Sequence, residues 1–224
     1  MNLELLFEAS LLTDNKKYYD IAVSHAKKTL QNHFRPDYSS YHVVDYEPET
    51  GEVIKRLTHQ GFADESIWSR GQAWGLYGFT MCYRYTKDES FLQQACHIAD
   101  FFFSQPNLPA DMIPYWDMRD PSINTGKTVA RDASAAAIFA SGLYELAQYV
   151  SKEDASRYLA IADKILDSLV VDYQADTQTH QGFLLLHSTG NHPANDEIDV
   201  PINYADYYYL EALTRQKARS QQNE

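Results

Sequence analysis

Cysteine is scarce in this chain. The 224 residues include two, Cys82 and Cys96, and neither belongs to a CxxC motif or has histidine partners at metal-ligand spacing. We therefore expect no disulfide framework and no structural metal site. The same scarcity favours a reducing compartment, so the sequence predicts a cytoplasmic protein.

Long apolar runs are also missing. No segment approaches the roughly 18 consecutive apolar residues that identify a membrane-spanning helix. The start of the chain, Met1-Asn2-Leu3-Glu4, lacks the basic region and the small-residue cleavage site of a signal peptide. We therefore expect a soluble protein without a membrane partner.

Positive charge is in deficit. Lysine and arginine number 19 against 31 acidic residues, which gives a formal net charge of −12, and the basic residues are scattered along the chain. A nucleic-acid partner is not expected, because phosphate binding needs a basic patch or stripe. An anionic ligand would have to be held by a few local groups.

Apolar residues and tyrosine are plentiful. The hydrophobic fraction is 44%, which is enough for one sizeable core in a chain of this length. Tyrosine occurs 17 times. An aromatic ring with a polar tip suits both packed helices and sugar-binding clefts, although ordinary core and rim positions account for most of these residues.

The chain repeats itself at a spacing near seventy residues. One helical face recurs at i, i+4 and i+8 with spacings of 73 and 67, in Tyr18-Ala22-Ala26, Phe91-Ala95-Ala99 and Tyr158-Ala162-Leu166. Gly75-Leu76-Tyr77 returns as Gly142-Leu143-Tyr144, and Thr58-His59-Gln60-Gly61-Phe62 returns as Thr179-His180-Gln181-Gly182-Phe183. The repeating unit is a long polar loop, a helix rich in small and aromatic residues, a short turn and a second helix.

This pattern predicts seven helices. We place them at residues 2–13, 15–32, 66–86, 88–104, 131–150, 153–172 and 202–216. The loops near 33–65, 105–130 and 173–201 are unusually long, and Tyr41–Val44 and Glu52–Ile54 read as strand-like pieces joined through Gly51. Because such loops would gather at one end of the helices, we expect a site there.

One stretch carries a long and specific motif. Residues 58–79 resemble glycoside hydrolase family 88, the unsaturated glucuronyl hydrolases. Shorter supporting matches occur at residues 114–117, 131–137 and 203–213, so the resemblance spans nearly the whole chain. It identifies the chain as the C-terminal part of a longer family member.

The resemblance implies an all-α fold, an (α/α)6 toroid of helical hairpins with small β-hairpins in its long loops. Seven helices correspond to an incomplete toroid, which we assign to residues 1–216 as a single domain. Residues 217–224 offer no apolar anchor, so we expect a frayed tail. Apolar helix faces that an incomplete ring leaves exposed would favour self-association of the chain.

The resemblance also implies a reaction. The family removes a 4,5-unsaturated uronic acid from oligosaccharides left by polysaccharide lyases, and it does so by adding water across the vinyl ether. No metal or other cofactor is implied. The two catalytic aspartates of the family correspond to positions ahead of Met1, so we name no catalytic residue in this chain.

Four substrate-binding positions survive in the match: His42, Gln60, Arg70 and Trp74. Arg70 and Trp74 stand at i and i+4 on one helical face, where a guanidinium could grip a carboxylate while an indole packs on the sugar ring. From spacing alone, such a pair is more typical of structural residues. His42 and Gln60 rest on the resemblance alone.

Other acids read as structural. Asp64 and Glu65 precede an expected helix start and Asp132 precedes another, so we expect all three to cap helices. Asp117, Glu197 and Asp199 lie in loops, where solvated carboxylates are common. We nominate none of them as catalytic.

Three other functions stay open. An unsaturated rhamnogalacturonyl hydrolase acting on pectin fragments would share the fold and the chemistry. A sugar epimerase on a related toroid would need two catalytic histidines on inner helices, whereas His59 and His180 fall in loops. A catalytically inactive carbohydrate-binding fragment would follow directly from the missing aspartates.

Overall fold

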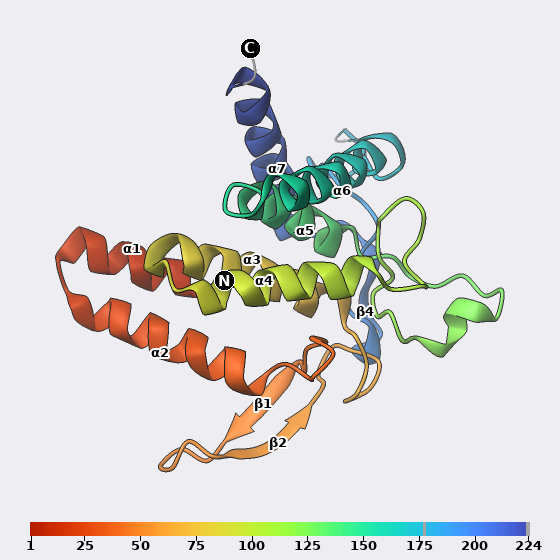
Figure 1. The fold of residues 1–224 in the computed structure, drawn as a ribbon. Coiled ribbons are helices and arrows are strands. Elements are labelled where there is room, and N and C mark those ends of the chain that lie inside the picture. Colours follow the sequence, from red (N-terminus) through yellow and green to blue (C-terminus); the bar gives the residue numbers. More distant parts are fainter. Residues whose placement is uncertain (177, 223–224) are drawn as a thin grey trace.

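The computed structural model of the chain describes residues 1–176 and 178–222 (Figure 1). Seven α-helices run through these residues, in agreement with the expected number. Their bounds are α1 Leu3–Thr13, α2 Lys16–Asn32, α3 Ser69–Thr86, α4 Glu89–Phe103, α5 Ala133–Leu146, α6 Lys152–Asp172 and α7 Asn203–Gln222. Two short 3-10 helices, η1 Pro121–Asn124 and η2 His192–Ala194, lie in the loops.

Short turns close the helical hairpins. The C-cap residues that follow α1 and α3, Asp14 and Lys87, are both in the left-handed conformation, with φ of 52° and 55°. Helices α4 and α6 begin with side-chain caps, since the Asp88 carboxylate accepts the Ser90 N–H and the Ser151 hydroxyl accepts the Asp154 N–H. Each hairpin therefore reverses within a few residues.

The helices alternate between an inner and an outer row. α3 packs against α5 and α5 against α7, while α4 covers α3 and α6 covers α5. Every residue of α5 is buried, which makes this helix the centre of the core. The repeated faces Phe91-Ala95-Ala99 and Tyr158-Ala162-Leu166 are buried as well. The arrangement is an incomplete (α/α) toroid.

Repeated glycines permit close helix contacts. A Cβ on Gly142 of α5 would lie 2.5 Å from Leu76 Cδ2 of α3, and a Cβ on Gly75 would lie 3.2 Å from the Phe34 ring. The Gly-Leu-Tyr repeat therefore marks the places where an inner helix meets a neighbour.

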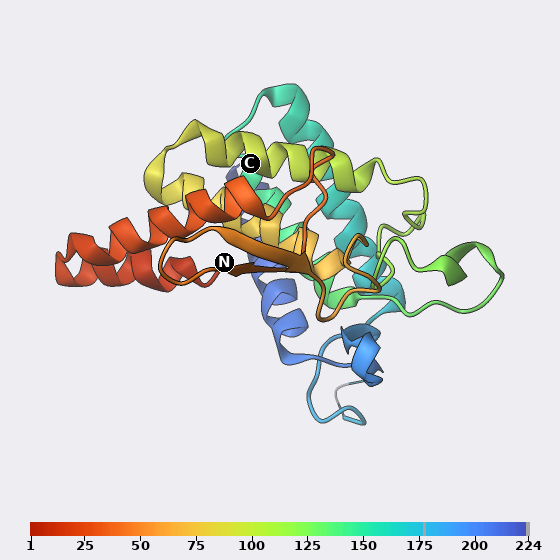
Figure 2. The ribbon, with the colours of Figure 1, turned by 90° about the horizontal axis from the view of Figure 1, so that it is seen from below.

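Two antiparallel hairpins stand in the long loops. Strand β1 Val43–Tyr46 pairs with β2 Val53–Leu57, and β3 Ser188–Asn191 pairs with β4 Asp196–Val200. Gly51 turns the first hairpin with φ of 72°, as the sequence predicts. In the view from below, the loops of 104–132 and of 173–176 and 178–202 lie on the side of the molecule away from the α1–α2 turn (Figure 2).

The C-terminal segment differs from expectation. Residues 217–222, predicted to be part of a frayed tail, continue helix α7, and residues 223–224 lie outside the described part of the chain. This end of the helix makes a polar contact with α6, since Arg219 Nη2 lies 3.0 Å from Asp163 Oδ2. Among the described residues, no helix is long and apolar enough to cross a membrane.

Candidate functional site

A cleft of about 600 Å³ opens along α3, from Gly71 to Cys82. Its walls come from one side of α3, the start of α1, the second half of α2 and the segment that leads to β1. His42 and Trp74, two of the predicted binding residues, both line it. Gln60 and Arg70 do not, so the structure brings together half of the predicted set in one cavity.

Trp74 is half-buried at one wall of the cleft. Its ring meets Tyr208 edge-on at 5.2 Å and lies 6.1 Å from Tyr204, both on α7. The indole is therefore braced by aromatic rings behind it. A half-exposed, braced indole of this kind can pack against the apolar face of a sugar ring.

His42 is fixed from two directions. Its ring stacks on Trp68 with centroids 4.1 Å apart. Its Nδ1 accepts the backbone N–H of His59 at 3.1 Å and of Gln60 at 3.0 Å. Partial burial lowers the pKa of His42 to about 4, with nearby His59 and Arg70 acting in the same direction. Near neutral pH the imidazole is uncharged and Nε2 carries its proton.

Gln60 reaches the site through its main chain. Its backbone N–H bonds His42, and its half-buried side chain is separate from the cleft lining. The loop that carries it, residues 58–67, precedes the start of α3. The sequence expectation of a side-chain contact between Gln60 and a sugar stays a prediction.

Arg70 is buried, with 3% of its surface exposed. Its guanidinium donates to Asp132 Oδ2 at 2.7 Å and to the carbonyl oxygens of Thr189 and Gly190. It also lies over the Trp68 ring at 4.6 Å and the Tyr204 ring at 5.7 Å. Arg70 thus ties α3 to the start of α5 and to β3, a role that its i, i+4 spacing to Trp74 did not reveal.

Three acids are buried among the described residues: Asp117, Asp132 and Glu145. Asp132 faces Arg70 and caps α5 by accepting from Ser134 and Ala135, as the sequence predicts. Glu145 pairs with Arg84 and Arg215 on the far half of α5. A single buried carboxylate therefore faces Arg70 in this part of the chain.

Asp117 corrects a prediction. It was expected to be a solvated loop acid, yet its side chain is fully buried. Oδ2 accepts from Phe62 N at 2.9 Å and Ser66 Oγ at 2.5 Å, and Oδ1 accepts from Ile67 N at 3.2 Å and Arg119 N at 2.9 Å. No sequence spacing signals the contact with the 62–67 turn, because those partners lie about fifty residues away. Glu197 and Asp199 are exposed, as expected.

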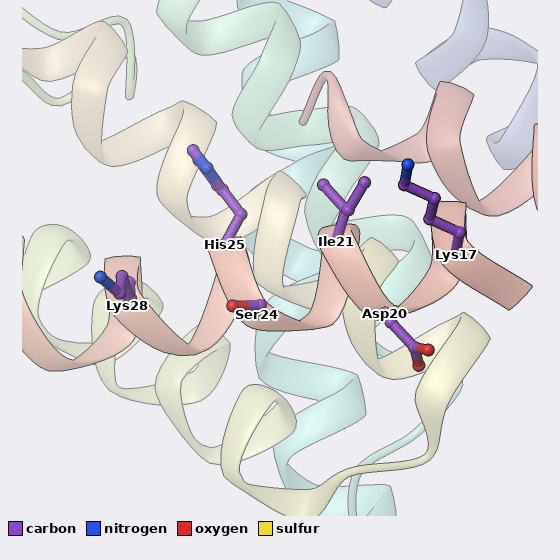
Figure 3. Close-up of a pocket in the computed structure, with 6 residues that line it drawn as sticks. All are labelled: Lys17, Asp20, Ile21, Ser24, His25 and Lys28. Carbon is purple, nitrogen blue, oxygen red and sulfur yellow. The ribbon is translucent and has the colours of Figure 1, made fainter. Parts of the chain in front are cut away.

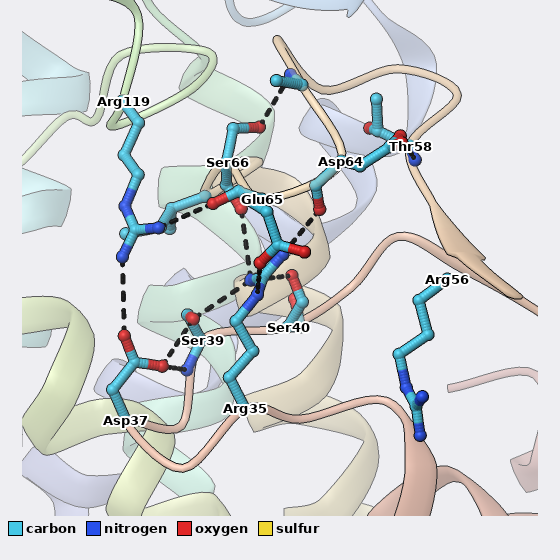
Figure 4. A network of polar contacts seen from close by, with 12 residues as sticks. Arg35, Asp37, Ser39, Ser40, Arg56, Thr58, Asp64, Glu65, Ser66 and Arg119 are labelled. Carbon is cyan, nitrogen blue, oxygen red and sulfur yellow. Dashed lines mark hydrogen bonds and ion pairs between the residues drawn. The ribbon is translucent and has the colours of Figure 1, made fainter.

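Asp64 and Glu65 also differ from expectation, since neither caps α3. Asp64 accepts the Thr58 N–H at 2.7 Å, and Glu65 pairs with Arg35 at 2.9 Å (Figure 4). Helix α3 begins at Ser69 instead of residue 66, because the preceding residues are held as a loop. The helix cap Trp68 makes no side-chain cap bond, and its ring stacks on His42.

Sequence reasoning missed Trp68 as a site residue. The nearest sequence signal is Gly71, one turn later, where an added Cβ would lie 2.7 Å from the Trp68 ring. Glycine at this position leaves room for the indole to lie along the start of α3. The Trp68 ring then forms part of the cleft wall together with His42.

A second hollow, of about 630 Å³, lies on the surface of α2. Figure 3 shows its lining, which consists of Lys17, Asp20, Ile21, Ser24, His25 and Lys28. Because one helix supplies all six side chains, this hollow cannot surround a ligand. The cleft beside α3 is the better candidate site.

No protein-family model matches the chain. An unsaturated glucuronyl hydrolase of Formosa agariphila is 49% identical over 218 residues, which are 97% of this chain and 53% of that protein. An unsaturated chondroitin disaccharide hydrolase of Streptococcus pneumoniae is 39% identical over 217 residues, 96% of this chain and 54% of that protein. The chain spans about half the length of these curated relatives.

Solved structures agree. A crystal structure of an unsaturated glucuronyl hydrolase specific for heparin matches with a TM-score of 0.94 and 48% identity, over 98% of this chain and 58% of that one. The unsaturated glucuronyl hydrolase of Bacillus sp. GL1 matches with a TM-score of 0.89 and 34% identity, over 96% and 56%. Sequence and fold therefore coincide along nearly all of the chain, which belongs, over this shared half of their length, to the unsaturated glucuronyl hydrolase family.

Proposed function

We propose that this chain is the substrate-binding part of an unsaturated glucuronyl hydrolase of glycoside hydrolase family 88. The reaction would release a 4,5-unsaturated uronic acid from lyase-generated glycosaminoglycan oligosaccharides by hydration of the vinyl ether. The observation that carries the proposal is the 49% identity to a glucuronyl hydrolase over 97% of the chain. The relatives' names do not favour an unsaturated rhamnogalacturonyl hydrolase.

The cleft beside α3 supports a sugar ligand. Trp74 offers an apolar ring face, and His42 offers a neutral imidazole on the same cavity. A carbohydrate needs this combination, because its C–H faces pack on aromatic rings while its hydroxyls need hydrogen-bond partners. Relatives are named for chondroitin and heparin substrates, so unsaturated disaccharides of these two kinds are the substrates we propose.

Arg70 and Gln60 complete the proposed binding set. A guanidinium has five N–H donors, and three contacts of Arg70 go to Asp132, Thr189 and Gly190. We propose that the two remaining donors, Nε–H and one Nη2–H, bind the uronate carboxylate beside Trp68, which requires a small opening because Arg70 is 3% exposed in the structure. The buried pairing with Asp132 would fix the guanidinium in place for that contact.

The acid–base groups of the reaction are proposed to come from outside this chain. Each buried carboxylate of the described residues is already engaged: Asp117 by four donors, Asp132 by Arg70 and a helix start, Glu145 by two arginines. A catalytic acid or base must be able to exchange its proton with the substrate. We therefore expect binding without turnover from the chain alone.

The test uses purified chain and an unsaturated chondroitin or heparin disaccharide. Calorimetry should detect binding, and Trp74→Ala should weaken it about tenfold or more, because the indole supplies the ring contact. Tyr207→Ala, at an exposed aromatic residue outside the cleft, is the matched control and should bind like the parent. A binding isotherm for Trp74→Ala equal to that of the parent would contradict the proposal that the sugar binds in this cleft.

The same mixtures report on catalysis. The ultraviolet absorbance of the vinyl ether should stay constant with the chain alone. Loss of this absorbance at an enzymatic rate would mean that an acid of this chain handles the proton. We also propose a cytoplasmic location, which the free state of Cys82 and Cys96 supports.

A further inference from the structure

Loop 58–67 is held from two sides. On one side Arg35, which is 9% exposed, donates to the carbonyl oxygens of Asp64 and Ser66 at 2.6 and 3.3 Å and to the Glu65 carboxylate (Figure 4). Arg119 adds a bond to the Glu65 carbonyl at 2.6 Å. Arg35 thereby fastens the loop to the segment that precedes β1, and Arg119 fastens it to the loop that also carries Asp117.

On the other side the loop closes around Asp117. This carboxylate receives the N–H groups of Phe62 and Ile67 and the Ser66 hydroxyl, so it gathers both ends of the 62–67 turn. An added Cβ on Gly61 would lie 3.2 Å from Asp117 Oδ2, which shows how tightly the loop wraps the acid. Among the described residues, no cation pairs directly with Asp117. Its charge is balanced by hydrogen-bond donors, most of them from the loop.

The held loop presents two N–H groups at its start. Those of His59 and Gln60 both point at His42 Nδ1. An imidazole nitrogen that accepts two hydrogen bonds cannot carry a proton. The proton of the neutral ring is therefore on Nε2, for which the described residues supply no hydrogen-bond partner, and His42 lines the cleft.

We propose that Asp117 is a positioning residue that, by holding loop 58–67, keeps two backbone N–H groups on His42 Nδ1 and so makes His42 a fixed Nε2–H donor to an acceptor oxygen of the ligand. The part that concerns the ligand rests on the proposed function. A carboxylate or hydroxyl oxygen of a uronic acid would meet this donor. His42 itself offers neither a base nor a hydrogen-bond acceptor to the cleft.

The groups that face His42 agree with this arrangement. His59 lies near it from loop 58–67, His33 from the end of α2 and Arg70 from α3. Trp68 covers one ring face. These neighbours and burial all oppose a charged imidazole. Release of the loop would remove the two N–H groups that oppose protonation at Nδ1.

The test is NMR on the isotopically labelled chain without ligand, comparing the parent with Asp117→Asn. In the parent, the His59 and Gln60 amides should exchange slowly with solvent, and the pKa of His42 should be near 4. The side-chain amide that this substitution introduces would turn a donor toward either the Phe62 and Ser66 groups or the Ile67 and Arg119 groups. We expect faster exchange of both amides and a His42 pKa raised toward its ordinary value of 6.5.

Asp111→Asn is the matched control. Asp111 lies on the same long loop but binds Ile113, Arg131 and Tyr173, so His42 should titrate as in the parent. If Asp117→Asn does not fold, Ser66→Ala removes one donor to the same oxygen and should give a smaller shift in the same direction. A His42 titration and amide exchange in Asp117→Asn equal to those of the parent would overturn the proposal.

Measuring disaccharide binding to the parent and to Asp117→Asn distinguishes failure of this proposal from failure of the proposed function. Asp117→Asn should bind the unsaturated disaccharide about five- to tenfold more weakly, the effect of one lost hydrogen bond. If the parent binds no disaccharide while Asp117→Asn shows the expected NMR changes, the proposed function is wrong and the positioning role of Asp117 still holds. If the NMR changes appear in Asp117→Asn but its affinity for the disaccharide equals that of the parent, His42 is not a hydrogen-bond donor to the ligand.

Discussion

A buried ion pair joins three separate segments at the residue scale. Arg70 of α3 meets Asp132 at the start of α5, and the same guanidinium holds the carbonyl oxygens of β3. Both partners are almost fully buried. A pair of this kind adds little net stability over apolar residues of equal size, but loss of one partner leaves the other charge without compensation.

Asp132→Asn should therefore be strongly destabilising. We expect the free energy of unfolding to fall by about 3–5 kcal/mol, measured as a shift of the urea midpoint at constant slope. Asp20→Asn is the control, since the Lys16–Asp20 pair is exposed and should change stability by less than ~1 kcal/mol. Equal small effects of the two substitutions would contradict the role given to the buried pair.

Close helix contact explains the repeat at the element scale. Gly75 and Gly142 occupy equivalent places in two hairpins, and each allows a neighbouring side chain to approach the helix backbone. The repeat is visible in the sequence because each hairpin needs a small residue at the same place, where a neighbouring side chain approaches the helix backbone. The partners differ, however: Gly142 meets Leu76 of another hairpin, whereas Gly75 meets Ile98 of its own hairpin and Phe34 of the segment that follows α2.

Gly142→Val should destabilise the α3–α5 contact. The added carbons would meet Leu76, so overpacking should cost about 1–3 kcal/mol, measured by chemical denaturation. Ala160→Val adds bulk at an exposed position of α6, where helix propensity changes stability by only about 0.5 kcal/mol. A Gly142→Val variant as stable as Ala160→Val would mean that the contact between α5 and α3 accommodates the larger side chain without strain.

Apolar side chains remain exposed at the scale of the whole molecule. On α1 the exposed fractions of Leu5, Leu11 and Leu12 are 76%, 70% and 84%, and on α7 Tyr207 and Leu210 are also exposed. These two helices stand at the ends of the helical array. Because apolar patches of this kind favour association, we propose that the chain self-associates through these faces.

Sedimentation at several protein concentrations tests whether the chain self-associates. The parent chain should sediment above the monomer mass as its concentration rises, and replacing Leu11 and Leu12 together by lysine should return it to a monomer. Ile54→Lys changes one isolated exposed residue of β2, with 63% exposure, and should behave like the parent. A monodisperse parent monomer at every concentration would refute self-association.

The helices and their hairpin order followed from the sequence alone. Periodic apolar positions and capping residues act over a few residues, so the cap at Asp132 could be predicted locally, and Asp88 and Ser151 follow the same rule. The motif at 58–79 likewise pointed to the family before any contact was known. Trp74 lies within this motif and His42 outside it; both were named from the family resemblance, and both line the cleft.

Only the tertiary structure decided what the loop acids and Arg70 do. Asp117 binds a loop about fifty residues away, Arg70 is taken up by Asp132 and β3, and residues 217–222 stay helical through Asp163. These contacts join segments that no periodicity relates. A buried polar group must find its partner wherever the fold brings one near, so the identity of that partner is a property of the packed chain and not of the local sequence.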